Sequence, residues 1–175
     1  KSTKKQIEKL LNRDLNPLKI IAVFIDGKRF AKLGVVVALG VGEDGKKSVL
    51  GIYQSSTESS EACLSLLNDL EKRGMPESNL LFVVDGGSGL NKALQKKYQV
   101  EDAEKRRAVR VRCYFHKWNN LRDALDKKGQ DEANSLFWAI RAAKDTSSAA
   151  TASVALEEVL KKHNMSALAS YHESK

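Results

Sequence analysis

The spacing of apolar residues predicts strands in the first two thirds of the chain and helices in the last third. Apolar runs bounded by turn residues indicate strands at 19–26, 34–41, 48–54, 80–85 and 109–115. Helical periodicity predicts helices at 2–15, 59–74 and 89–98. From His116 onward the pattern is helical to the end. The predicted order is therefore three strands, a helix, a strand, a helix and a strand, followed by helices only.

This order predicts a mixed sheet. The segment GEDGKK joins the second and third strands, and Asp44-Gly45 within it is expected to supply the positive φ angles of a tight hairpin turn, so the first three strands form an antiparallel meander. A helix between two strands of one sheet makes those strands parallel. The fold class is therefore α/β, with a mixed five-stranded sheet flanked by helices and followed by an all-helical segment.

Two of the apolar strands end in Asp-Gly, as IIAVFIDG at Asp26 and LLFVVDGG at Asp85. If the fourth strand lies beside the first and parallel to it, both carboxylates reach the same edge of the sheet. Two adjacent carboxylates repel each other unless a proton or a cation lies between them. The pair therefore suggests a divalent metal site, although Asp-Gly is also a common turn dipeptide and each aspartate taken singly fits a turn.

The composition is that of a globular protein with a basic surplus. In 175 residues, 42% are hydrophobic and 30% are charged, enough for one core or for a core with a small appended subdomain. The formal net charge of +8 favours a polyanionic partner, and nucleic acid is the commonest one. Composition does not choose between DNA, RNA and an anionic membrane surface.

The chain has no sign of a membrane span or a signal peptide. No apolar stretch reaches the ~18 residues that cross a bilayer, and KSTKKQIEKL lacks an apolar signal core. A cytosolic location is expected, with Cys63 and Cys113 reduced. Because the chain begins at Lys1 without Met, we expect a fragment of a longer protein.

Other motifs are weaker. VVDGGSGLNKA lacks the Gly-Lys-Ser/Thr of a P-loop and the last Gly of a nucleophile elbow. Its glycines are therefore expected only to let the chain turn from strand to helix, and Ser88 is expected to be catalytically idle. Cys113 and His116 have the spacing of half a zinc site, but no regular second half follows. His116 is interpreted as a residue that touches a phosphate or orients a metal ligand, or that caps the following helix. The basic residues from 105 to 112 form either a solvated loop or a phosphate-contacting edge.

Four segments together resemble the core of bacterial transposases of the Mutator-like insertion-sequence family. They are VFIDG, VVVALGVGEDGKKSVLGI, LLFVVDGGSGLNKAL and RCYFHKWNNL. The resemblance covers most of residues 15 to about 162. It implies a ribonuclease-H-like fold with an N-terminal helix at 1–18, a catalytic core at 19–128 and part of a helical insertion at 129–175.

The resemblance also implies an Asp, Asp, Glu triad that binds two Mg²⁺ (or Mn²⁺) ions and cleaves and joins DNA. Asp26 matches the first acid and Asp85 the second. The third acid belongs to a Thr-Asn-x-Ile-Glu type of segment that is not found here, and we expect it beyond Lys175. The implied partners are transposon ends and target DNA, with a homo-oligomer of the full-length protein in the bacterial cytoplasm, at the nucleoid.

The candidate site is therefore assigned as follows. The catalytic residues are Asp26, Asp85 and His116, with the two aspartates as metal ligands, and the DNA-binding residues are Lys28, Arg29, Arg110, Arg112 and Lys117. Two alternatives remain open. One is a non-catalytic nucleic-acid-binding or assembly module of the same fold, with vestigial or structural acids. The other is a small phosphatase or an RNA-directed nuclease that uses the same metal chemistry.

Overall fold

The strands and helices follow the predicted order. The computed structural model describes residues 2–30, 33–55 and 59–172, and it leaves out the side chains of residues 2, 28–30, 33 and 55. The chain divides into two compact units, Lys1–Cys113 and Tyr114–Lys175, each of which is treated by itself. The first unit contains α1 (Ser2–Leu11), the 3-10 helix η1 (Asn16–Leu18), β1 (Ile20–Phe30), β2 (Leu33–Gly42), β3 (Lys47–Ser55), α2 (Ser60–Lys72), β4 (Leu80–Val84), α3 (Ser88–Tyr98) and β5 (Ala108–Arg112).

The five strands form one mixed sheet in the order β3-β2-β1-β4-β5. The pairs β1–β2 and β2–β3 are antiparallel, which confirms the predicted meander. The pairs β1–β4 and β4–β5 are parallel, because a helix connects β3 to β4 and another connects β4 to β5. The α/β class with a ribonuclease-H-like mixed sheet is thus confirmed.

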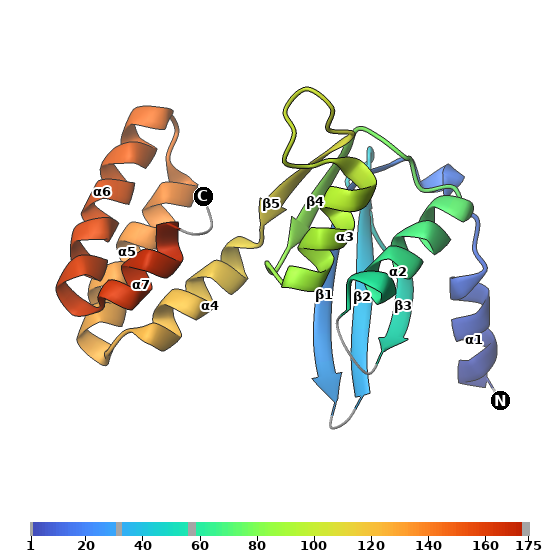
Figure 1. The fold of residues 1–175 in the computed structure, drawn as a ribbon, viewed down its shortest axis with the longest axis horizontal. Helices are drawn as coiled ribbons and strands as arrows, with labels where there is room; N and C mark the ends of the chain where they lie inside the picture. Colours follow the sequence, from blue (N-terminus) through green and yellow to red (C-terminus); the bar gives the residue numbers. More distant parts are fainter. Residues whose placement is uncertain (1, 31–32, 56–58, 173–175) are drawn as a thin grey trace. The chain divides into compact units, whose positions relative to one another are not determined.

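Helices α2 and α3 cover one face of this sheet (Figure 1). Leu66, Leu67 and Leu70 of α2 are buried, as are Leu90 and Leu94 of α3, and they meet the buried strand residues in one apolar core. The ends of α2 follow from its sequence. Ser59 Oγ accepts a hydrogen bond from Ala62 N (3.2 Å) at the start, and Gly74, at φ 100°, closes the last turn.

Four predicted details were wrong. The first strand does not stop at Asp26 but runs to Phe30, because β2 continues beside it from Val37 to Leu33. The last strand ends at Arg112 rather than at residue 115, and a helix begins at Tyr114. The first helix ends at Leu11 rather than at residue 15. In the hairpin turn only Gly45 has a positive φ (75°), since Asp44 Oδ1 accepts from Lys46 N and holds the turn.

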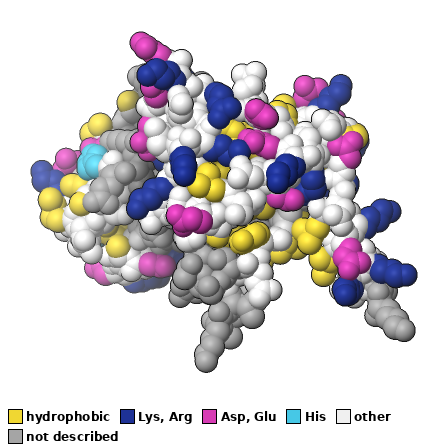
Figure 2. All heavy atoms as spheres, turned by 45° about the vertical axis from the view of Figure 1, so that its right-hand side comes forward, with side chains coloured by type: hydrophobic (Ala, Val, Ile, Leu, Met, Phe, Trp, Pro, Cys, Tyr) yellow, Lys and Arg dark blue, Asp and Glu magenta, His cyan; other side chains and the backbone are white. Residues whose placement is uncertain are grey.

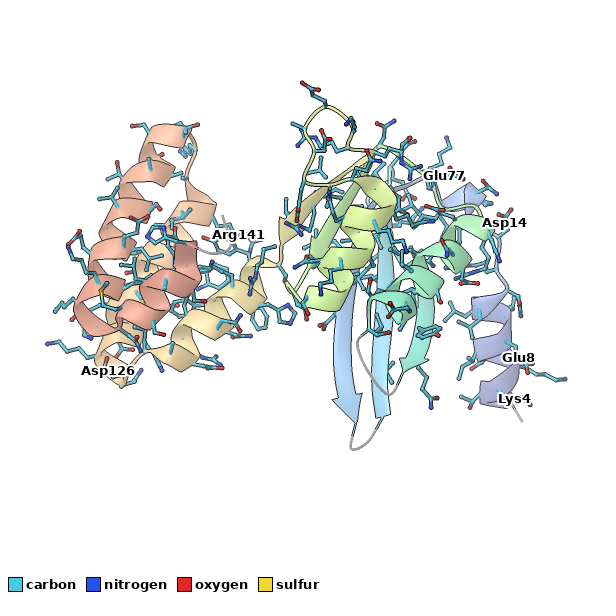
Figure 3. The ribbon with its side chains drawn as sticks, viewed as in Figure 1. Lys4, Glu8, Asp14, Glu77, Asp126 and Arg141 are labelled. Carbon is cyan, nitrogen blue, oxygen red and sulfur yellow. The ribbon has the colours of Figure 1, made fainter. Side chains whose placement is uncertain are left out.

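The second unit consists of α4 (Tyr114–Ala124), α5 (Lys127–Ala142), α6 (Thr146–His163) and α7 (Met165–His172). Helices α5 and α6 lie side by side (Figure 1). Asp126 lies at the start of α5 (Figure 3), where its Oδ1 accepts from Gly129 N at 2.7 Å. The buried core of this unit includes Trp118, Leu121, Phe137, Leu156 and Leu160. The predicted boundary between core and insertion, at 128/129, stays a prediction, because compactness does not define a catalytic domain.

Candidate active site

Asp26 and Asp85 lie at the same level of the sheet, where the pairing between β1 and β4 ends. The last residues paired between these two strands are Ile25 and Val84, and each is followed directly by one of the aspartates. Neighbouring strands lie about 4.8 Å apart, which makes these two positions near neighbours. The predicted placement of the fourth strand beside the first is thus confirmed, whereas the chemical roles of the aspartates stay predictions.

Strand alternation decides the face on which Asp26 lies. Val23 and Ile25 are 0% and 2% exposed, and they point toward α2 and α3. Phe24 is 39% exposed and Asp26 is exposed, which places both on the opposite face. That face carries further exposed apolar residues from other strands, namely Val49, Ile52, Leu81, Val109 and Val111. Asp26 therefore lies at the edge of an open apolar surface.

Asp85 begins the turn from β4 into α3. Its Oδ1 accepts a hydrogen bond from Gly87 N at 2.9 Å. Gly86, between them, has φ +96°, a conformation that favours glycine. A β-carbon at Gly86 would lie 2.7 Å from Cζ of Arg112, so the Arg112 guanidinium packs directly against this turn. The prediction that the glycines let the chain turn agrees with this geometry.

The end of β5 is held against the end of β4. Cys113 N donates to Val84 O at 2.6 Å, which continues the parallel pairing to the residue before Asp85. Arg110 forms an ion pair with Glu101 (Nη1 to Oε1, 3.3 Å), and Arg112 contacts Gly86. The structure thus brings Arg112, a predicted DNA-binding residue, to the Asp85 turn.

The remaining predicted site residues lie on β1 and in the second unit. Lys28 and Arg29 lie on β1, but their side chains are outside the described part of the structure. His116 lies in the first turn of α4, in the second unit. Lys117 is buried, and its Nζ donates to Ser170 O (3.0 Å) and Tyr171 O (2.7 Å). Lys117 thus ties α4 to α7, and its role at DNA stays a prediction.

The donor set suits a hard cation that needs few protein ligands. Within 2–30, 33–55 and 59–172, no group of three or more His, Cys, Asp or Glu side chains is placed to hold a metal ion. Mg²⁺ is commonly bound through one or two carboxylates, with water and substrate phosphates as its other ligands. Asp26 and Asp85 therefore fit Mg²⁺ or Mn²⁺, and they do not form a closed protein cage.

A cavity of about 420 Å³ lies elsewhere, at the opposite end of β1. Its lining includes Pro17, Lys19, Glu43 and Lys46 and contains neither aspartate of the candidate site. The charges at this cavity pair with one another, as Lys19 with Glu43 (3.9 Å) and Lys46 with Asp44 (2.8 Å). The hydrogen bonds from Lys46 lower the pKa of Asp44.

Charges of both signs are interspersed on the face shown in Figure 2, where Lys and Arg side chains alternate with Asp and Glu. The net positive charge of +8 is therefore not concentrated in one basic patch on that face. In the described residues no helix is long and apolar enough to cross a membrane.

The comparison with known proteins identifies the family. The model of the family described as "Transposase, Mutator family" matches residues 3–175. The chain belongs to the Mutator family of transposases. It is 33% identical over 151 residues to the transposase for insertion sequence element IS6120 of Mycolicibacterium smegmatis, covering 83% of this chain and 44% of that protein.

A second relative of this Mutator-family chain is the transposase for insertion sequence element IST2 of Acidithiobacillus ferrooxidans. It is 30% identical over 102 residues, which are 58% of this chain and 32% of that protein. The matched region thus spans less than half the length of each relative. Recognition of the family from the four resembling segments is therefore confirmed.

Proposed function

We propose that this chain carries the metal-binding aspartates of a DDE-type polynucleotidyl transferase, and that the whole transposase cleaves DNA and transfers strands. The observation that carries the proposal is the register of β1 and β4, which sets Asp26 and Asp85 side by side. Membership in a transposase family supplies the reaction class.

In this proposal Asp26 and Asp85 bind Mg²⁺ or Mn²⁺, with two ions in the complete enzyme. Such ions, when bound, activate the attacking water or 3′-hydroxyl and stabilise the leaving oxygen. The chain's own contribution is orientation. The β1–β4 register sets the level of the two carboxylates, and the hydrogen bond from Gly87 N to Asp85 Oδ1 (2.9 Å) restrains one of them.

The third carboxylate, a Glu, comes from a part of the protein outside residues 1–175. The matched region spans less than half the length of each relative, which is consistent with a third ligand elsewhere in the protein. The substrate is DNA, as transposon ends and target in the bacterial nucleoid, and the full-length protein acts as a homo-oligomer. The net charge of +8 and the Arg112 guanidinium beside the Asp85 turn support a polyanionic substrate.

The test is Mn²⁺ binding to this chain, measured by electron paramagnetic resonance. We expect Asp26→Asn and Asp85→Asn each to weaken Mn²⁺ binding by about 10-fold or more, because each removes half of the charge of the donor pair. The control is Glu43→Gln, which neutralises an exposed carboxylate at the other end of the sheet. Mn²⁺ binding that survives both Asn substitutions would favour the non-catalytic nucleic-acid-binding module.

In the full-length protein, the same two substitutions are expected to abolish strand transfer and to leave DNA binding intact. Retained strand transfer in either variant would contradict the assignment. A preference for RNA over DNA under the same conditions would instead favour the nuclease alternative.

A further inference from the structure

The turn that presents Asp85 is held by a side chain from α3. Gly86 and Gly87 have no side chains, and α3 has no side-chain cap at Gly87. Asp85 Oδ1 accepts from Gly87 N, so the orientation of the carboxylate depends on where the Gly86–Gly87 peptide points. Glycine peptides have wide conformational freedom. A contact from another residue is therefore needed to fix the orientation of the Gly86–Gly87 peptide.

Asn91 supplies that contact from the first turn of α3. Its Nδ2 donates to Gly86 O at 3.0 Å, and its backbone N donates to Gly87 O at 3.0 Å. Asp85 accepts a hydrogen bond from the Gly87 amide, and Asn91 binds the carbonyl groups on both sides of that amide. Rotation of the Gly86–Gly87 peptide would break the side-chain contact.

The other end of the Asn91 amide indicates why an asparagine is present. Its Oδ1 is buried and has no hydrogen-bond partner within the described part of the chain. Burying an unpaired amide oxygen is unfavourable, and an apolar residue of similar size would avoid the cost. A flipped amide would instead set Oδ1 against the Gly86 carbonyl oxygen. The Nδ2 donor is therefore the useful part of this side chain.

We propose that Asn91 is a positioning residue for Asp85, and that it holds the Asp85 carboxylate in the orientation that receives a divalent cation. The proposal rests on the proposed function of Asp85 as a metal ligand. Asn91 acts through the Gly86 carbonyl and the Gly87 amide, and it touches neither the cation nor DNA. Groups that orient metal ligands in this way typically change metal affinity by about 10-fold or more when removed.

The experiment compares Asn91→Ala and Asn91→Leu with the wild-type chain. Asn91→Leu keeps the number and branching of the side-chain heavy atoms and removes the donor without adding charge. We expect both variants to bind Mn²⁺ about 10-fold more weakly. We also expect the Gly87 amide, followed by NMR hydrogen exchange without metal, to exchange about 10-fold faster as its bond to Asp85 is released.

The control for a merely structural role is Leu94→Ala. Leu94 is 0% exposed in the same helix, so its truncation lowers overall stability without touching the turn. It should leave both the Mn²⁺ affinity of the folded protein and the Gly87 exchange rate unchanged. If Leu94→Ala moved both readouts as far as the Asn91 variants do, the effect would be general destabilisation and the inference would be overturned.

Asp85→Asn separates the two proposals. If it binds Mn²⁺ as tightly as wild type, the metal site is wrong and the inference falls with it. If Asp85→Asn loses Mn²⁺ while both Asn91 variants bind it normally and keep slow Gly87 exchange, the metal site stands and the inference alone is overturned. Weakened binding with faster Gly87 exchange in both Asn91 variants supports it.

Discussion

The guanidinium of Arg112 lies against the α-carbon of Gly86, so that a β-carbon added there would come within 2.7 Å of Cζ. This contact joins the end of β5 to the turn that carries Asp85. At Gly86 the backbone angle disfavours a side chain, and an added methyl group would require the Arg112 guanidinium to move.

Gly86→Ala should therefore destabilise the first unit by about 1 to 3 kcal/mol, since alanine at φ +96° is strained and its methyl group also requires the Arg112 guanidinium to move. Gly45→Ala is the matched control, because Gly45 has φ +75° with no atom within 4 Å of an added β-carbon. It should cost about 1 kcal/mol, from backbone strain alone. Urea denaturation measures both, and equal losses would show that the Arg112 contact is unimportant.

Tyr98→Phe should lower stability at neutral pH by about 1 to 3 kcal/mol, because Glu71 loses a hydrogen bond in a largely buried site. The Tyr98 hydroxyl donates to Glu71 Oε1 at 2.7 Å, and Lys97 Nζ lies 2.6 Å from Glu71 Oε2. Tyr53→Phe, on β3, removes a hydroxyl that is not bonded to Glu71 and serves as the control. Thermal unfolding followed by circular dichroism measures the loss.

The same residue predicts an alkaline pH dependence. Burial is the main cause that raises the pKa of Tyr98 far above its usual value, and the hydrogen bond to Glu71 raises it further. Because the folded pKa exceeds the unfolded one, this stabilisation is complete below about pH 10 and is lost as the pH rises further. Wild type should lose stability more steeply than Tyr98→Phe above about pH 10. Parallel curves for the two proteins would contradict the prediction.

Lys117→Met should loosen α7. The buried Lys117 ammonium donates to two carbonyls in the last turn of that helix, where a cation is favourable. We expect a loss of about 1 to 3 kcal/mol in the second unit, and faster hydrogen exchange in α7. Lys128→Met, at an exposed position of α5, is the control. Weaker DNA binding with unchanged stability would instead favour the predicted role of Lys117 at DNA.

Asp145→Ala should lower the melting temperature of the second unit at pH 7. Asp145 caps α6, since its Oδ1 accepts from Ser148 N at 2.7 Å and from Ser148 Oγ at 2.7 Å. These hydrogen bonds lower the pKa of Asp145. The stabilisation is therefore complete above the usual aspartate pKa of about 4 and disappears as the pH falls below it. Melting temperatures of wild type and variant should converge between pH 7 and pH 2, and a constant difference over this range would contradict the prediction.

Much of this architecture could be predicted from the chain alone, for a local physical reason. Apolar spacing distinguishes strands from helices because their side-chain periods differ, and connections through helices made β1, β4 and β5 parallel. The same pattern predicted Asp26 and Asp85 at one edge of the sheet if the fourth strand lay beside the first, and β4 does pair with β1. The four segments that resemble Mutator-family transposases were specific enough to identify the family.

Tertiary structure decided what depends on contacts between distant segments. The first strand continues past Asp26 because β2 pairs with it there, and nothing in the residues of β1 alone signals that pairing. Lys117 has the charge of a DNA contact, yet folding places its ammonium on the carbonyls of α7. Asn91 follows no local motif, since its role depends on a glycine carbonyl that only the turn from β4 into α3 brings within reach. Periodicity reports the shape of each element, and the partners of a side chain exist only after the elements have packed.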